Sequence, residues 1–140
     1  MKSAVLDASI LVKLFFEEDH STAAEQCVRD VPQLLAPDLV WSEVANVIWK
    51  RHRRGDLSAE DSAEMTSWML GLPLNIWPSA DLIPDALDLA MQFDRTVYDS
   101  LYVALAVRAS SVMLTGDKRL VNSLEGTPLE KYIAWIGNYR

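Results

Sequence analysis

Four acidic residues are the part of this chain with the clearest potential for chemistry: Asp7, Glu43, Asp99 and Asp117. Asp7 follows the short apolar run 3–6, and Asp117 follows the run 111–115. If these runs are neighbouring parallel strands, their acids meet at the sheet edge where open α/β folds form a binding crevice. The other two acids lie in the first turns of apolar helical patterns, so we expect them to face the same crevice.

Such a group of acids needs a partner, because two unit charges about 4 Å apart repel by about 4 kcal/mol at an effective dielectric near 20. A divalent cation is the simplest one, and oxygen-only ligands favour Mg²⁺ or Mn²⁺. Ions of this kind activate water and stabilise the leaving oxygen in phosphodiester cleavage. The hydroxyls of Ser9 and Thr115 lie close in sequence and are candidates for orienting the carboxylates.

Each acid also has an ordinary structural interpretation. Asp7 is well placed to cap a helix, Asp99 to stabilise the positive end of one, and Asp117 to occupy a turn after a glycine. Glu43 is harder to explain in this way, because it falls inside a strongly apolar helical pattern where an unpaired carboxylate is costly. A shared metal site accounts for all four positions at once.

Composition limits the classes of protein to consider. The chain has 140 residues, half of them hydrophobic, which predicts one globular domain spanning 1–140. A net charge of −7 is typical of proteins that bind nucleic acid poorly, although a metal site and the basic run 50–54 weaken that inference. One cysteine and two histidines exclude an intramolecular disulfide and disfavour a zinc site. Without a signal-like or membrane-spanning segment, the expected location is the cytoplasm.

Strand-like runs alternate with helical patterns, which predicts an α/β fold with a central parallel sheet. The strands are expected at 3–7, 33–36, 75–77 and 111–115, with an edge strand near 132–135. The helices are expected at 8–16, 21–30, 38–54, 58–70, 83–93, 98–109 and 118–124. Asp38 is the expected N-cap of the third helix, and Gly55 its stop.

The four acids also stand within four longer motifs: VLDAS at 5–9, EVANV at 43–47, YDSLYVALA at 98–106 and LTGDKRL at 114–120. In order and spacing, these resemble the four motifs of the PIN-domain nucleases. More specifically, they resemble the VapC-type toxins of bacterial and archaeal toxin–antitoxin pairs. The resemblance covers nearly the whole chain, with no departure at the four acids.

This resemblance implies a three-layer α/β/α domain that acts as a metal-dependent endoribonuclease and toxin. It places Asp7, Glu43, Asp99 and Asp117 in the acidic metal site, with Ser9 and Thr115 at the supporting hydroxyl positions. The family uses Mg²⁺ or Mn²⁺ to cleave single-stranded or structured RNA, usually as a homodimer. A VapB-type antitoxin, encoded alongside, inserts its C-terminal segment into the active-site groove.

The basic run 50–54 offers candidate RNA contacts. Lys50 and Arg54 lie seven and eleven residues after Glu43, so all three project from roughly one helical face. Lys50 would sit about 10 Å along the helix from Glu43, a suitable distance for a phosphate beside the cleavage point. Solvation of these cations at a helix C-terminus is the ordinary alternative.

Three other functions fit parts of the sequence. A phosphate-signalling receiver domain also has an acidic Mg²⁺ pocket, but Asp7 has no acidic neighbour and the run 33–36 has no phospho-accepting aspartate. A non-catalytic binding module with the PIN fold would neither bind metal well nor cut RNA. A DNA-directed nuclease of the wider fold family usually carries segments for which 140 residues leave no room.

Overall fold

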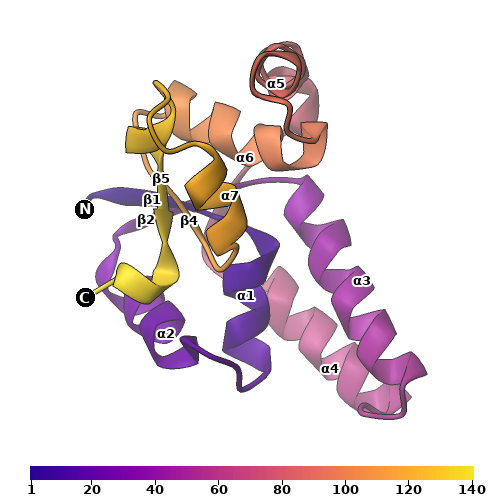
Figure 1. Cartoon of the computed structure of the whole chain (residues 1–140). Coiled ribbons are helices and arrows are strands. Elements are labelled where there is room, and N and C mark those ends of the chain that lie inside the picture. The colour runs from indigo at the N-terminus through magenta and orange to yellow at the C-terminus, as the bar shows by residue number, and fades with distance from the viewer.

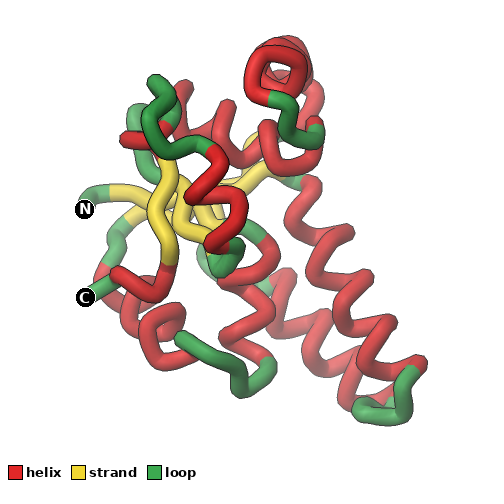
Figure 2. Tube along the Cα trace, in the orientation of Figure 1, coloured by secondary structure: helices red, strands yellow, loops and turns green.

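The computed structural model describes all 140 residues, Met1–Arg140. Helices and strands alternate along most of the chain (Figures 1 and 2). Their bounds are β1 Ser3–Leu6, α1 Ala8–Phe15, α2 Ser21–Asp30, β2 Gln33–Pro37, α3 Leu39–Arg53, α4 Ala59–Leu70, β3 Leu74–Trp77, α5 Ser79–Phe93, α6 Val97–Arg108, β4 Met113–Thr115, α7 Lys118–Ser123 and β5 Ile133–Trp135. Two short 3₁₀ turns, Glu130–Tyr132 and Ile136–Asn138, flank β5.

The five strands form one sheet in the order β3-β2-β1-β4-β5, and every pairing is parallel. The predicted α/β fold and the pairing of the first strand with the 111–115 strand are therefore confirmed. Receiver domains have the strand order 2-1-3-4-5, so this order excludes the receiver-type alternative. Here the order reverses beside β1, and the switch point lies between the carboxyl ends of β1 and β4.

Helices cover both faces of the sheet, as a three-layer fold requires. Figure 1 shows α6 above the sheet, with α5 packed on its outer side, and α1 and α2 below. α3 and α4 pack against each other and extend away from the sheet. Central strands buried on both faces are mostly apolar. All three residues of β4 are buried, and its last residue, Thr115, is the polar one. The residues 100–106 of α6 are also buried all round the helix.

One residue explains the two main differences from the predicted elements. Asp38 precedes α3, but its side chain does not cap that helix. Its Oδ1 instead accepts hydrogen bonds from the backbone N–H and the hydroxyl of Ser79, at the first residue of α5. This contact satisfies an N–H that the start of a helix leaves free. α5 therefore begins at Ser79, four residues before the predicted start.

The remaining helix ends follow local chemistry. Ser58 accepts a hydrogen bond from the N–H of Asp61 at 3.0 Å and caps α4, and Gly55 stops the preceding helix with a φ of 86°. None of the helices has both the length and the apolar character needed to cross a membrane.

Candidate active site

The switch point of the sheet brings together Asp7, which follows β1, and the loop that follows β4. Oδ2 of Asp7 accepts a hydrogen bond from the Thr115 hydroxyl at 2.5 Å. The same hydroxyl oxygen accepts the backbone N–H of Asp117 at 3.0 Å. Thr115 is fully buried, so its side chain is a fixed bridge between the two acidic positions.

A second hydroxyl holds the same loop from the other side. Ser9 donates to Oδ1 of Asp7 at 2.5 Å and accepts the backbone N–H of Gly116 at 2.8 Å. Space at Gly116 is tight, because a Cβ there would lie 3.0 Å from Cε of Lys13 and 3.2 Å from Oγ of Ser9. The two predicted supporting hydroxyls therefore both contact Asp7, and a glycine lets the loop approach them.

Asp7 is a carboxylate in an unfavourable setting for negative charge. It caps α1 by accepting the N–H of Ile10 at 3.2 Å. Burial raises the pKa of Asp7 to about 6, although hydrogen bonds from Ser9, Thr115 and Ile10 oppose the shift, and Glu43 adds repulsion. The capping role and the candidate active-site role therefore coincide in one residue.

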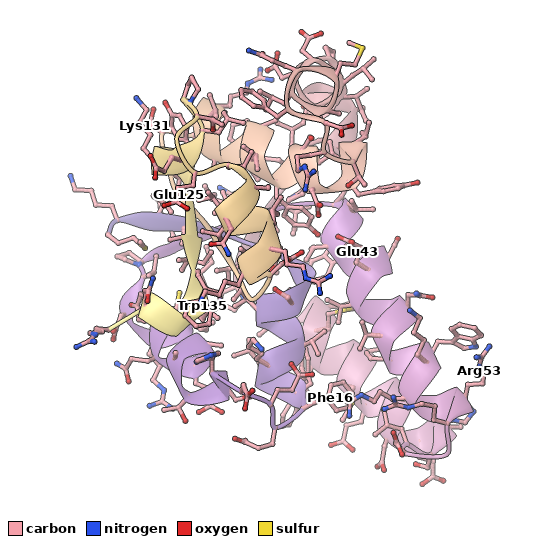
Figure 3. The ribbon with its side chains drawn as sticks, in the orientation of Figure 1. Phe16, Glu43, Arg53, Glu125, Lys131 and Trp135 are labelled. Atoms are coloured by element: carbon pink, nitrogen blue, oxygen red, sulfur yellow. The ribbon has the colours of Figure 1, made fainter.

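Glu43, on α3, lies on the same side of the molecule as Asp7 and the carboxyl ends of β1 and β4. Figure 3 shows it on the part of α3 nearest to α6. The Tyr102 hydroxyl of α6 donates a hydrogen bond to Oε1 of Glu43. The pKa of Glu43 is raised, mainly by burial and further by the charge of Asp99, whereas the tyrosine hydrogen bond opposes the shift. Its side chain is thus turned toward α6.

Asp99 and Asp117 complete the group. Asp99 lies in the first turn of α6, where its N–H donates to Oγ1 of Thr96 at 3.0 Å. The pKa of Asp99 is raised, mainly by burial and then by the charge of Asp117, while Thr96 and Arg95 oppose the shift. Asp117 is exposed and caps α7 through the N–H of Leu120 at 3.1 Å. An unbroken series of repulsions therefore links Asp7, Glu43, Asp99 and Asp117.

The four acids share this edge but do not form the compact cluster that we expected. No three acidic, histidine or cysteine side chains of the chain are arranged to enclose one metal ion. The reason is local: Asp7 is held by two hydroxyls, Glu43 by Tyr102, and Asp117 by the N-terminus of α7.

The chemistry of the donor set fits a hard divalent cation. All four candidate ligands are carboxylates, and the side chains of Ser9 and Thr115 add only oxygen. The two histidines, His20 and His52, are exposed, and Cys27 is buried on the inner face of α2. Oxygen-only ligands are typical of Mg²⁺, Mn²⁺ or Ca²⁺ sites rather than zinc sites.

The predicted RNA contacts are exposed at the far end of α3. Lys50 forms no ion pair, whereas Arg54 pairs with Asp56 at 2.8 Å. Arg51 is instead the residue of this run that faces the protein, since its guanidinium lies 4.4 Å from the centre of the Phe16 ring and 3.2 Å from Glu18. Figure 3 shows Arg53 at the outer side of the same end.

Two residues near the acids were missed by sequence reasoning: Tyr102, which donates a hydrogen bond to Glu43, and Arg95, whose charge opposes the pKa shift of Asp99. Tyr102 follows Asp99 by three residues, so helical spacing alone puts both on neighbouring positions of one face. Lys13 follows Ser9 by four residues on α1, and its side chain lies beside Gly116. Nothing else in the sequence marks these residues, because Tyr102 lies in an apolar run and Arg95 lies outside the four motifs.

The family profile described as PIN domain matches residues 4–123. A curated relative, ribonuclease VapC3 from Pyrobaculum aerophilum, is 37% identical over 118 residues, which cover 83% of this chain and 90% of the relative.

Solved structures show the same fold. PAE2754 from Pyrobaculum aerophilum superposes with a TM-score of 0.72 at 20% identity, over 96% of this chain and 84% of that one. A toxin–antitoxin complex from Klebsiella pneumoniae has a TM-score of 0.64 at 19% identity, over 94% of this chain and 95% of that one. At these identities the likeness establishes the architecture alone.

Proposed function

Because the chain belongs to the PIN-domain family, we propose that it is a metal-dependent endoribonuclease and the toxin of a VapBC-type pair. Its activity would be hydrolysis of RNA phosphodiester bonds by the single nuclease unit 1–140. The relative that is 37% identical is named a ribonuclease, and this supports the substrate class. The observation that carries the proposal is the junction at the sheet's switch point, where the buried Thr115 hydroxyl binds both Asp7 and the backbone N–H of Asp117. Glu43 lies close enough to raise the pKa of Asp7, and Asp99 close enough to raise that of Glu43.

Asp7, Glu43, Asp99 and Asp117 would hold Mg²⁺ or Mn²⁺. When bound, such an ion neutralises the substrate phosphate, activates a water molecule and stabilises the leaving oxygen. Thr115 and Ser9 favour the ionised form of the Asp7 carboxylate and fix its direction by donating to both of its oxygens. Thr115 also holds the N–H of Asp117, so the spacing of the two acids is set by one buried side chain.

Lys50 and Arg54 would contact RNA phosphates beyond the cleavage point. Lys50 is free of ion pairs and exposed, and Arg54 would have to exchange Asp56 for a phosphate. Such contacts position the RNA without reading its bases. Their charge would also offset the repulsion between RNA and a chain with a net charge of −7.

Two protein partners belong to the proposal. The first is a VapB-type antitoxin, supported by the fold shared with the toxin–antitoxin complex from Klebsiella pneumoniae. The second is another copy of this chain. Ile83, Leu87 and Met91 recur every four residues along α5 and are 42%, 46% and 69% exposed, which is consistent with an interface on that helix. Light scattering of the wild type and of Leu87→Glu would test this: a dimer that dissociates in the variant is expected.

The nuclease proposal is tested with labelled single-stranded and hairpin RNAs, and with DNA of the same sequences. Purified protein is incubated with Mg²⁺, with Mn²⁺ and with EDTA. The expected result is that RNA is cut with Mg²⁺ or Mn²⁺ and is not cut with EDTA. A protein that binds RNA but cuts none under any condition would support the non-catalytic binding module instead, and preferential cutting of DNA would assign a different substrate.

A further inference from the structure

Tyr102 makes the only side-chain hydrogen bond of Glu43. The tyrosine is 2% exposed, in the middle of the buried stretch of α6. Its hydroxyl donates to Oε1 of Glu43 on α3, across a sequence separation of 59 residues. No other hydrogen bond or ion pair involves the Glu43 side chain, so nothing else fixes the direction of this carboxylate.

The direction of the hydrogen bond is set by the surroundings of Tyr102. Burial and the nearby carboxylates Glu43, Asp7 and Asp99 all raise the pKa of this phenol. In the hydrogen bond itself the hydroxyl is the donor and Oε1 of Glu43 the acceptor. A donor is the group that a carboxylate requires, because an ionised carboxylate only accepts hydrogen bonds.

Its place on α6 connects Tyr102 to a second acid. Residues three apart on a helix are neighbours on one face, so Tyr102 and Asp99 present their side chains to the same side of α6. The charge of Asp99 also raises the pKa of Glu43. Tyr102 thus pulls Glu43 toward the helix that carries Asp99.

We infer that Tyr102 is a positioning residue, which holds the Glu43 carboxylate in the orientation needed to share a divalent cation with Asp99. The inference rests on the proposed nuclease function and adds a residue to it. Groups that orient a metal ligand typically change metal affinity or activity 10- to 100-fold when they are removed. A tyrosine that served packing alone would be replaced by phenylalanine without such a loss.

The test is a double-mutant cycle between Tyr102→Phe and Glu43→Ala. Mn²⁺ affinity is measured by calorimetry without RNA, and RNA cleavage is measured separately. Tyr102→Phe is expected to weaken Mn²⁺ binding about tenfold and to slow cleavage, with little change in the thermal midpoint without metal. In the Glu43→Ala background the same substitution is expected to have no further effect, because its only target is gone. Tyr132→Phe is the control, since the Tyr132 hydroxyl makes no side-chain hydrogen bond.

The outcomes separate the inference from the function on which it rests. Normal Mn²⁺ affinity and cleavage in Tyr102→Phe, beside an active wild type, would overturn the inference alone. A full tenfold loss that persists in the Glu43→Ala background would also overturn it, because Tyr102 would then act through the fold. A wild type that neither binds Mn²⁺ nor cuts RNA would overturn both the function and the inference.

Discussion

Thr115 and Asp7 are separated by 108 residues in sequence, yet the Thr115 hydroxyl donates to Oδ2 of Asp7 at 2.5 Å. The contact joins the ends of the two neighbouring strands β1 and β4. Because the same hydroxyl accepts the N–H of Asp117, one buried atom fixes two of the four acids. Several properties of the site depend on this single bridge.

Thr115→Val removes the bridge while keeping the shape of the side chain. We expect a loss of about 1–3 kcal/mol in the free energy of unfolding, because the N–H of Asp117 loses its acceptor. The rate of RNA cleavage should also fall, even under conditions in which the variant is fully folded. Thr115→Ser retains the hydroxyl and should keep most of the activity, with a smaller loss from the deleted methyl group. Urea unfolding and cleavage rates measure the two effects, and equal activity in both variants would contradict the role given to the hydroxyl.

Asp7 should make the metal-free protein less stable as the pH rises. Its pKa is raised by burial to about 6 in the folded state, above the value of about 4 in the unfolded chain. The folded state therefore binds the proton more tightly. This contribution is fully present below pH 4 and is lost as the pH rises to about 6, with an upper limit of about 3 kcal/mol.

Asp7→Asn removes this penalty and keeps a side chain that caps helices well. In EDTA the stability of the variant should depend less on pH between 4 and 7 than that of the wild type. One hydroxyl, of Ser9 or Thr115, loses its acceptor in the variant, because the amide nitrogen of asparagine only donates. Cleavage should be abolished. Urea unfolding at several pH values measures the first effect. A pH dependence between 4 and 7 that is the same in the variant and the wild type would contradict the role given to Asp7.

Any side chain at position 116 should reduce RNA cleavage, because Gly116 lies close to Lys13 and Ser9. In Gly116→Ala the new Cβ would lie 3.0 Å from Lys13 and 3.2 Å from Ser9, so one of them must move. Lys13 can shift, but a shift of Ser9 disturbs its hydrogen bond to Asp7. Cleavage is expected to fall at least tenfold with a small change in thermal midpoint. Gly71→Ala is the matched control, because its nearest contacts begin at 3.5 Å.

The salt dependence of RNA binding should report on Lys50 and Arg54. On single strands each phosphate contact contributes about 0.7 to the slope of log affinity against log salt. If both residues bind phosphates, Lys50→Ala/Arg54→Ala should lower the slope by about 1.4. Arg29→Ala is the control, since Arg29 is exposed on α2 and pairs with Glu25. Binding is measured in an Asp99→Asn background to prevent cleavage, and an unchanged slope would remove both residues from the RNA path.

Local signals in the sequence were enough to predict the order of the elements. Apolar runs predicted all five strands, and the cap at Ser58 was identified from its own neighbours. Asp38 shows where local signals end. It has the ideal sequence position to cap α3, but it binds Ser79, 41 residues away, because the fold brings the start of α5 beside it. No local pattern contains that contact.

Part of the candidate site could likewise be predicted from local sequence, and part could not. The acids were predicted from their positions at strand ends and helix starts, and Ser9 and Thr115 from their closeness in sequence. The partner of Glu43 was missed, because Tyr102 reads as one more apolar residue of a buried helix. The directions of the carboxylates also depend on local hydrogen bonds, so the compact cluster expected from charge alone does not form.

The central claim is that the acids of the switch point hydrolyse RNA with a divalent cation. It is tested most directly by the cleavage rate of Asp99→Asn beside that of Asp88→Asn, an equal change of charge at an exposed position on α5. We predict that the wild type and Asp88→Asn cut RNA at similar rates with Mn²⁺ and not with EDTA, and that Asp99→Asn cuts at least a hundredfold more slowly. Cleavage that survives in Asp99→Asn or in EDTA would contradict the account.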